Sequence, residues 1–370
     1  MKQADALSIL FLLGSLPGRA ACELDAFLGE PEFSNTPVHK GGRFPNIVVA
    51  KDGSLLAFWN GVVLKRSADG GQTWGETIEV GKGFMGGGVT VNEKNGDIFA
   101  FVEAHHPPAD LGIYRSQDNG LSWEKTAATI HPDKRGNMPS MHMNEHGTSL
   151  SRGKHAGRLL RPSRYYAGQN HSSKWPLHYS NAIFSDDGGK TWQTSEPFPA
   201  NGTGEATLVE LSDGTVYYNS RRHYAEEGSN PRRRWTAKSY DGGETWQNLQ
   251  ICQALPDGPQ DTNYGLMAGL ARLPLEGKDI LVYSSADSQA GRKQGTVWAS
   301  FNGGGTWPVK RLVEPGKFAY SSVEAGRAGT PSEGSIYLHY ESATGSNVAR
   351  FNLAWILEGE PTGNGTIPKF

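Results

Sequence analysis

The sequence predicts an all-β protein folded as a six-bladed β-propeller, and three observations support this prediction. An eight-residue turn that ends in tryptophan recurs five times along the 370-residue chain. The segments between the copies are β-branched and aromatic runs broken by Asp-Gly or Asn-Gly pairs, which are typical of tight hairpins. No stretch keeps a helical apolar period over three turns. Repeated antiparallel sheets of this kind can protect their edges by packing in a ring.

The repeated turn sets the number of blades. Its copies read SADGGQTW, SQDNGLSW, SDDGGKTW, SYDGGETW and SFNGGGTW, and their tryptophans are separated by 49, 69, 54 and 61 residues. Spacing of this size indicates units of several strands each. From about Gly41 to Leu357 there is room for six units of roughly 50 residues. We expect the first and last strands to share one blade, which would close the ring of a single domain over residues 22–370.

The aspartate of each copy is expected to be structural. It can accept hydrogen bonds from backbone amides of its own turn, while the glycines supply positive φ. In the fifth copy Asn302 replaces the aspartate. A structural turn tolerates this replacement, whereas a catalytic acid would not. The turns are therefore expected on the outside of the ring, away from its mouth.

The N-terminus predicts export. The opening MKQADALSILFLLGSLPGRAAC has one lysine, a short apolar run, a helix breaker and small residues, which is typical of a secretory signal peptide over residues 1–21. The apolar run is too short to span a bilayer. A secreted or periplasmic protein is predicted. The alternative is a buried or frayed N-terminal segment. The two cysteines, Cys22 and Cys252, exclude a disulfide framework.

Charge limits the classes of partner. The formal net charge is −2, with 36 Lys and Arg against 38 Asp and Glu. Nothing in this balance favours a nucleic acid or an anionic membrane surface. We therefore expect neither nucleic-acid binding nor membrane insertion.

The repeated motif, S-x-D-x-G-x-T-W, is the Asp-box, and at this spacing the chain resembles the sialidase superfamily. Asp-boxes also occur in lyases, other glycosidases and binding proteins, so the ligand-facing segments matter more. GGRFPNIVVAKDGSLLAF resembles the opening of the family and places Arg43 at its first substrate arginine. GEATLVELSDGTVYYNSRR places Glu205 at the catalytic glutamate and Arg221 at the second arginine.

Two further segments complete the resemblance, which covers almost the whole predicted mature chain. AGRKQGTVWASFNGGGTW implies that Arg292 is the third arginine, with Lys293 and Arg311 as nearby alternatives. KFAYSSVEA followed by SIYLHYES implies that Tyr320 is the nucleophile and that Glu341 braces the first arginine.

The chemistry of these residue types is consistent with that assignment. A sialoside carries a carboxylate on its anomeric carbon, and three guanidiniums can hold a carboxylate through charge-assisted bonds. A neutral phenol approaches such a substrate without the repulsion that a carboxylate nucleophile would meet. Its ordinary pKa near 10 makes it a poor nucleophile, so it needs an adjacent base, and Glu205 would be that base.

The sequence departs from the family where the acid is expected. Family members usually insert a loop that delivers an aspartate before the first Asp-box, but LLAFWNGVVLKRSADGG has no aspartate between Trp59 and Asp69. The second unit contains FVEAHHPPADLGIYRS, where His105, His106 or Asp110 could protonate a leaving group. An ordinary polar loop is the alternative. A metal site is disfavoured because adjacent histidines on a strand point in opposite directions.

Other loops are expected to line the mouth. In QDTNYGLM, Asn263 and Tyr264 could meet the sugar ring or the aglycone. Two histidine-containing loops, MHMNEHGTS and QNHSSKW, could supply further subsites.

Together these features predict a retaining exo-glycosidase that releases terminal sialic acid, or a related 2-keto-3-deoxy sugar acid, from glycoconjugates through a tyrosyl intermediate. No cofactor and no metal are expected. One alternative is a propeller lyase or other glycosidase acting on a uronic-acid glycan, and another is a non-catalytic sialoglycan-binding propeller. An unsaturated product would indicate the lyase, and binding without turnover would indicate the binding protein.

Overall fold

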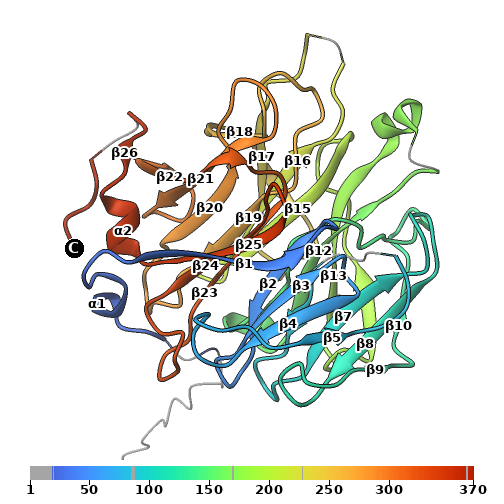
Figure 1. Cartoon of the computed structure of the whole chain (residues 1–370). Helices are drawn as coiled ribbons and strands as arrows, with labels where there is room; N and C mark the ends of the chain where they lie inside the picture. The colour runs from blue at the N-terminus through green and yellow to red at the C-terminus, as the bar shows by residue number, and fades with distance from the viewer. Residues whose placement is uncertain (1–18, 20, 85–87, 169–170, 227, 364–365) are drawn as a thin grey trace, which may run out of the picture.

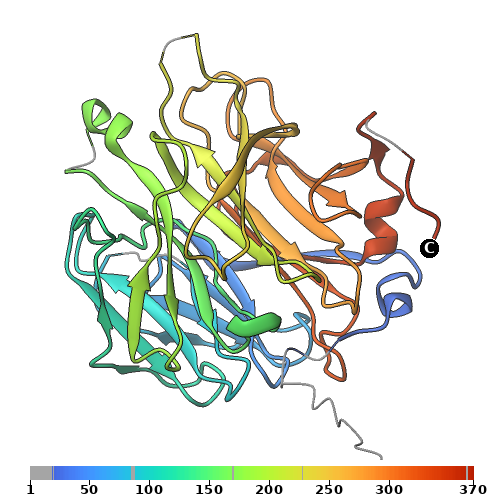
Figure 2. The same cartoon turned by 180° about the vertical axis from the view of Figure 1, so that it is seen from behind.

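The computed structural model describes residues 19, 21–84, 88–168, 171–226, 228–363 and 366–370. The predicted signal peptide lies outside these residues, apart from Arg19 and Ala21. Six sheets, each of four or five strands, are arranged around a common axis (Figures 1 and 2). The predicted six-bladed propeller is thereby confirmed.

The blades are numbered in chain order by their inner strands. Blade 1 contains β2 (Pro45–Val49), β3 (Leu55–Trp59), β4 (Val63–Ser67) and β5 (Thr77–Glu79). Blade 2 contains β6 (Thr90–Val91), β7 (Ile98–Glu103), β8 (Leu111–Ser116) and β9 (Glu124–Lys125). Blade 3 contains β11 (Thr148–Ser149), β12 (Leu159–Tyr165), β13 (Tyr179–Ser185), β14 (Thr191–Thr194) and the added strand β10 (Thr129–Ile130).

The second half of the ring follows the same plan. Blade 4 contains β15 (Thr203–Glu210), β16 (Val216–Arg222), β17 (Arg233–Ser239) and β18 (Gln247–Pro256). Blade 5 contains β19 (Gly269–Arg272), β20 (Leu281–Ala286), β21 (Lys293–Ser300), β22 (Val309–Lys317) and the added strand β26 (Glu360–Pro361). Blade 6 contains β23 (Ser321–Ala325), β24 (Ile336–Glu341), β25 (Gly345–Phe351) and β1 (Phe33–Lys40).

The ring closes by joining the two ends of the chain. Strand β1 pairs antiparallel with β25, from Phe33 opposite Phe351 to Lys40 opposite Gly345. Figure 1 shows the blue N-terminal strand beside the red C-terminal strands. The prediction that the first and last strands share one blade is therefore confirmed.

Strand direction separates the two ends of the ring. In blade 1 the inner strand β2 begins at Pro45, which pairs with Trp59, and ends at Val49, which pairs with Leu55. Strand β4 then returns, so that Ser67 lies opposite Leu55. The Asp-box that begins at Ser67 therefore lies at the end where β2 finishes. We call the opposite end, where the inner strands begin, the site face.

The Asp-box turns have the chemistry that the sequence predicts. Asp69 Oδ1 accepts the amides of Gln72 and Thr73, both at 3.0 Å, and the hydroxyl of Ser67 at 2.8 Å. The Thr73 hydroxyl donates to Asp69 Oδ2 at 2.5 Å. This bond, followed by the bond from the Thr73 amide, lowers the pKa of Asp69 to about 2. In the fifth copy Asn302 Oδ1 accepts the Thr306 amide at 2.8 Å. The aspartate is therefore a turn acceptor that asparagine can replace.

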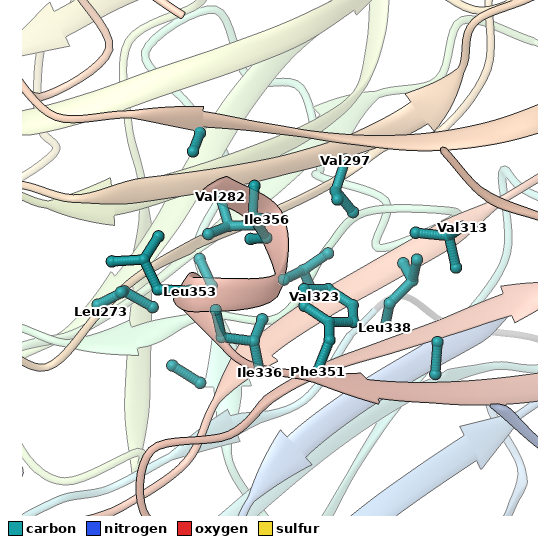
Figure 3. Close-up of a cluster of buried hydrophobic side chains, with 14 of the residues drawn as sticks. Leu273, Val282, Val297, Val313, Val323, Ile336, Leu338, Phe351, Leu353 and Ile356 are labelled. Atoms are coloured by element: carbon teal, nitrogen blue, oxygen red, sulfur yellow. The ribbon is translucent and has the colours of Figure 1, made fainter. Parts of the chain in front are cut away.

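Helices are short, and the core lies between sheets. Besides α1 (Leu24–Phe27), α2 (Leu353–Leu357) and two 3₁₀ turns (Gly153–His155 and Ser172–Leu177), the described residues form strands and loops. Figure 3 shows one cluster of buried side chains, in which Val282 and Val297 of blade 5 meet Val323 and Leu338 of blade 6 beneath α2. No described helix has the length and hydropathy needed to cross a membrane.

Candidate functional site

The connection between β3 and β4 is only three residues long. These strands are joined by the tight turn Asn60–Val62, with Asn60 at φ 55° and Gly61 at φ 68°. The Asn60 side chain accepts the Arg43 amide at 2.8 Å, and the Asn60 amide donates to the Arg43 carbonyl at 2.9 Å. The short turn thus fixes the backbone of Arg43 and leaves no room there for an acid-bearing loop.

Arg43 is paired with Glu341 across the boundary between blades 1 and 6. Arg43 donates to the Glu341 carboxylate through Nε at 3.2 Å and Nη2 at 3.3 Å, and the Phe44 amide donates to it at 3.0 Å. The Glu341 side chain is 6% exposed, whereas that of Arg43 is 46% exposed. The carboxylate therefore acts as a buried brace for a guanidinium that still faces solvent.

Tyr320 lies among three guanidiniums. The Arg43 and Arg292 guanidinium carbons each lie 4.9 Å from the centre of its ring, and Arg221 Nη1 lies 3.5 Å from its hydroxyl. Tyr320 comes directly before β23, and the Glu341 amide donates to its carbonyl at 2.9 Å. The structure thus brings together residues that are up to 277 positions apart in the sequence (320 − 43).

The position of Arg292 separates it from its alternatives. Lys293 is exposed at the start of β21. Arg311 lies over the ring of Trp355, 4.2 Å from its centre, and pairs with Glu358 at the outer edge of blade 5. Arg292 is thus the residue of the three that contacts Tyr320.

Glu205 is placed beside Tyr320 through Arg221. Arg221 Nη1 donates to Glu205 Oε2 and also contacts the Tyr320 hydroxyl, so one guanidinium bridges the two. Both Glu205 and Arg221 are buried, on the neighbouring strands β15 and β16. A carboxylate, a phenol and a cation therefore converge at the start of the inner strands.

Electrostatics favour the ionised form of Tyr320. Burial raises the pKa of the phenol, but the guanidiniums of Arg221, Arg292 and Arg43 together outweigh burial and bring the pKa below its usual 10. Glu341 opposes this effect. The arrangement can therefore hold an anion and supply an activated phenol at one place.

Aromatic and histidine rings form a continuous circuit of contacts around this centre. Successive ring centres are 4.4–6.2 Å apart, in the order Tyr320, Phe44, His142, His106, Tyr166, His178, His223, Trp175 and Tyr264. Arg221 completes the circuit, since its guanidinium lies 5.8 Å from the Tyr264 ring and also contacts Tyr320. Loops and strands from every part of the ring contribute, so aromatic and imidazole rings from all six blades contact one another beside the centre.

The three acid candidates do not lie together. His106 belongs to the circuit, with its ring 4.7 Å from that of His142 and its Nε2 3.5 Å from the Tyr166 hydroxyl. His105 is exposed and its Nδ1 lies 2.9 Å from the His106 carbonyl. Asp110 is also exposed, at the far end of the same loop. Burial lowers the pKa of His106 below its usual 6.5.

Asn263 and Tyr264 occupy different environments. The Asn263 carbonyl accepts from Asn230 at 2.6 Å, which ties this residue to the neighbouring hairpin. The Tyr264 carbonyl accepts from Arg221 Nε, and the residue is 40% exposed. Tyr264 is therefore the one of the pair that contacts an arginine of the site.

Sequence reasoning missed Phe44 of the circuit and Arg164 beside it. Phe44 follows Arg43 directly and has φ 71°, and this strained conformation cannot be read from the sequence. Arg164 is completely buried and its Nη1 lies 3.7 Å from Glu205 Oε1. The third arginine of GRLLRPSR, Arg164, was a visible signal, because a charged residue in a buried strand requires a partner. In the described residues, no three His, Cys, Asp or Glu side chains gather as they would to hold a metal ion.

Comparison with known proteins agrees with the architecture. Residues 53–332 match the family described as the BNR repeat-like domain. The chain is 32% identical to a sialidase of Micromonospora viridifaciens, in an alignment that covers 95% of this chain and 59% of that protein. The chain thus spans about three fifths of the length of that relative.

Solved structures share the fold at low sequence identity. The microbial sialidase Hz136 superposes with a TM-score of 0.65 at 21% identity, covering 92% of this chain and 69% of that one. The intramolecular trans-sialidase of Ruminococcus gnavus superposes with a TM-score of 0.64 at 14% identity, covering 87% and 98%. The repeats, the six blades and the match over residues 53–332 place this chain in the BNR-repeat family of the sialidase superfamily.

Proposed function

We propose that this protein is a retaining exo-glycosidase that releases terminal sialic acid, or a related 2-keto-3-deoxy sugar acid, from glycoconjugates. The observation that carries the proposal is the contact of Tyr320 with three guanidiniums, those of Arg43, Arg221 and Arg292. This arrangement suits a substrate that has a carboxylate on the carbon under attack. The likeness to a sialidase at 32% identity supports the same class of reaction.

In the first step the Tyr320 oxygen attacks the anomeric carbon while the three guanidiniums hold the substrate carboxylate. Glu205 takes the phenol proton, the bond to the aglycone oxygen breaks, and that oxygen leaves with a proton from a general acid. In the second step water attacks the same carbon and gives its proton to the group that acted as the general acid, which now acts as a base. The tyrosyl bond breaks, and Glu205 returns the proton to Tyr320. Two displacements on one carbon leave its configuration unchanged.

His106 is the general acid that we propose. It comes from blade 2 and is linked to Tyr320 by successive ring contacts with His142 and Phe44. His105 and Asp110 are exposed and are the alternative candidates for the general acid. The lowered pKa of His106 makes it a stronger acid but reduces its protonated fraction at neutral pH.

Two features of the surroundings belong to the same proposal. We propose that the protein is exported, on the signal-like sequence of residues 1–21.

We also propose that Tyr264, exposed and in contact with Arg221, meets the sugar ring or the aglycone, with the neighbouring Asn263 as a weaker candidate. An aromatic face beside a cation suits an amphipathic sugar.

Incubation of the purified protein with a sialyl-galactose and with an activated aryl sialoside tests the proposal. We expect free sialic acid from both substrates, and Tyr320→Phe should lower turnover at least about 10³-fold because the nucleophile is lost. Release from the aryl substrate alone would mean that no acid is supplied, since an aryl leaving group needs little protonation. Full turnover by the Tyr320→Phe variant, an unsaturated product or binding without turnover would each contradict the proposal.

A further inference from the structure

A fourth arginine lies beside Glu205, at the carboxylate oxygen other than the one to which Arg221 donates. Arg164 of β12 is completely buried, and its Nη1 lies 3.7 Å from Glu205 Oε1. Its Nη2 contacts two histidine nitrogens, His178 Nδ1 at 3.0 Å and His223 Nδ1 at 2.8 Å. The guanidinium also lies over the Tyr166 ring, 4.7 Å from its centre. Blades 3 and 4 are thus joined through one cation.

The two histidines must be neutral in this arrangement. A guanidinium only donates, so each Nδ1 must carry a lone pair and each ring must hold its proton on Nε2. Burial, followed by the Arg164 charge, lowers the pKa of His178 to about 3. Burial and the charges of Arg221 and Arg164 likewise lower the pKa of His223 well below 6.5. Both rings therefore stay acceptors across the ordinary pH range.

The backbone next to Glu205 leaves space for this guanidinium. A Cβ placed on Gly204 would lie 3.0 Å from Arg164 Cζ and Nη2, and 3.1 Å from Nη1. Glycine is therefore the residue that lets the guanidinium lie flat against the strand that carries Glu205. The Trp175 ring, stacked 4.6 Å from His223, contacts the same group of rings.

We propose that Arg164 is a positioning residue for Glu205, which it holds as an oriented carboxylate while His178 and His223 hold Arg164 in place. This inference rests on the proposed function, in which Glu205 is the base for Tyr320. Arg221 alone bridges Glu205 and Tyr320, so that the carboxylate could turn about that one contact. Arg164 Nη1 lies 3.7 Å from the other oxygen as an ion pair without a hydrogen bond, so that its charge attracts the carboxylate from a second direction and opposes its protonation.

Other charged and titratable groups face Arg164 and define the pH response. They are Glu205, Arg221 and His223 from blade 4, Tyr166, His178 and Tyr218 on adjoining strands, Glu103 and His106 from blade 2, and Tyr320 from blade 6. Removal of the Arg164 charge removes an attraction for the Glu205 carboxylate. It also removes a repulsion on protonated His106. The pH at which kcat/KM for natural substrates falls on the alkaline side should therefore rise too. An aryl substrate avoids this second effect because it needs no acid.

The test follows the titration of the Glu205 carboxyl carbon by NMR in ¹³C-glutamate-labelled protein, with the signal assigned by E205Q. We expect Arg164→Met to raise the Glu205 titration midpoint by about one pH unit, since an opposite charge within 4–6 Å typically shifts a carboxyl by one to three units. Arg164→Lys keeps the charge, so its Glu205 midpoint should lie at least halfway back from the Arg164→Met value to the wild-type value. In aryl sialoside hydrolysis the acid limb of kcat/KM should move by the same amount.

Arg161→Met is the matched control. Arg161 is equally buried on β12, but lies over Phe101, 4.4 Å from its ring centre. Its loss should leave the Glu205 midpoint within about 0.3 unit of wild type. Equal shifts in the two arginine variants, or an unshifted midpoint in Arg164→Met, would overturn the inference.

Gly204→Ala covers the case in which Arg164→Met does not fold. In the wild-type background the added methyl should displace the guanidinium and raise the Glu205 titration midpoint. In the Arg164→Lys background the same substitution should raise that midpoint by less, because the two changes act on one contact. Equal increments in both backgrounds would contradict the inference. The NMR titration needs no turnover, so a wild type without sialoside activity would reject the proposed function while this measurement still decides the role of Arg164.

Discussion

Glu341→Ala tests how Arg43 is held in place. The substitution removes the acceptor for Arg43 Nε and Nη2, at 3.2 and 3.3 Å, and for the Phe44 amide at 3.0 Å. A hydrogen bond to a charged group contributes about 1.5–3 kcal/mol when buried, and an exposed ion pair about 0–1 kcal/mol. Because the Arg43 side chain is 46% exposed and that of Glu341 is 6% exposed, we take about 1.5 kcal/mol for the brace.

At 1.36 kcal/mol per factor of ten, this loss predicts about a tenfold fall in kcat/KM. Glu341→Gln keeps an acceptor oxygen without the charge, so it should lose less, about threefold. The assay is hydrolysis of a fluorogenic aryl sialoside under subsaturating conditions, with thermal unfolding measured in parallel to verify that each variant is folded.

Glu358→Ala provides the control for this experiment. Glu358 pairs with Arg311 at 3.0 Å on the outer edge of blade 5, so its removal should change kcat/KM by less than about twofold. The reasoning would be refuted by a folded Glu341→Ala protein with the wild-type kcat/KM, or by an equal loss in Glu358→Ala.

Three further predictions concern pH, anion binding and the turns. Because burial lowers the pKa of His106 below 6.5 and the acid must be protonated, kcat/KM for sialyl-galactose should fall as pH rises through this lowered pKa, whereas that for an aryl sialoside should not; parallel profiles would exclude His106. Arg292→Met should raise the KM and the spectrophotometric pKa of Tyr320, because one of three charges that lower this pKa is lost, whereas Arg311→Met should change neither. Asp69, with its pKa lowered to about 2, stabilises the folded protein above pH about 4 and loses this effect as pH falls through 2. Between pH 5 and 2, the midpoint of urea unfolding should therefore fall less in Asp69→Asn than in wild type. An equal fall in the two proteins would contradict this role.

Much of the fold could be predicted because the repeated turn is local chemistry. Ser67, Asp69 and the glycines make their hydrogen bonds within a few residues, so five copies in the sequence correspond to five turns in the structure. The six blades were predicted from the spacing of these copies, and the pairing of the first and last strands in one blade was a separate expectation that β1 and β25 confirm. The added strands β10 and β26 were not predicted, because they are two residues long and owe their pairing to neighbours distant in sequence.

The candidate site could be predicted only where a motif carries it. Arg43, Tyr320 and Glu341 lie in segments that resemble the family, and the structure brings them together, while their roles stay predictions. Arg164 was missed because its partners, His178 and His223, come from separate loops with no common pattern. Contacts of this kind depend on how blades 3 and 4 meet, which the order of residues along one strand does not determine.

The covalent step at Tyr320 is the centre of this account, and one measurement tests it most directly. The protein is mixed with an activated aryl sialoside, quenched in acid within the first turnover and digested, and the peptides are weighed by mass spectrometry. We predict that the peptide containing Tyr320 gains the mass of one sugar-acid unit, and that the corresponding peptide of the Tyr320→Phe variant does not. A first turnover completed without any adduct on Tyr320, or with the adduct on another residue, would contradict the account.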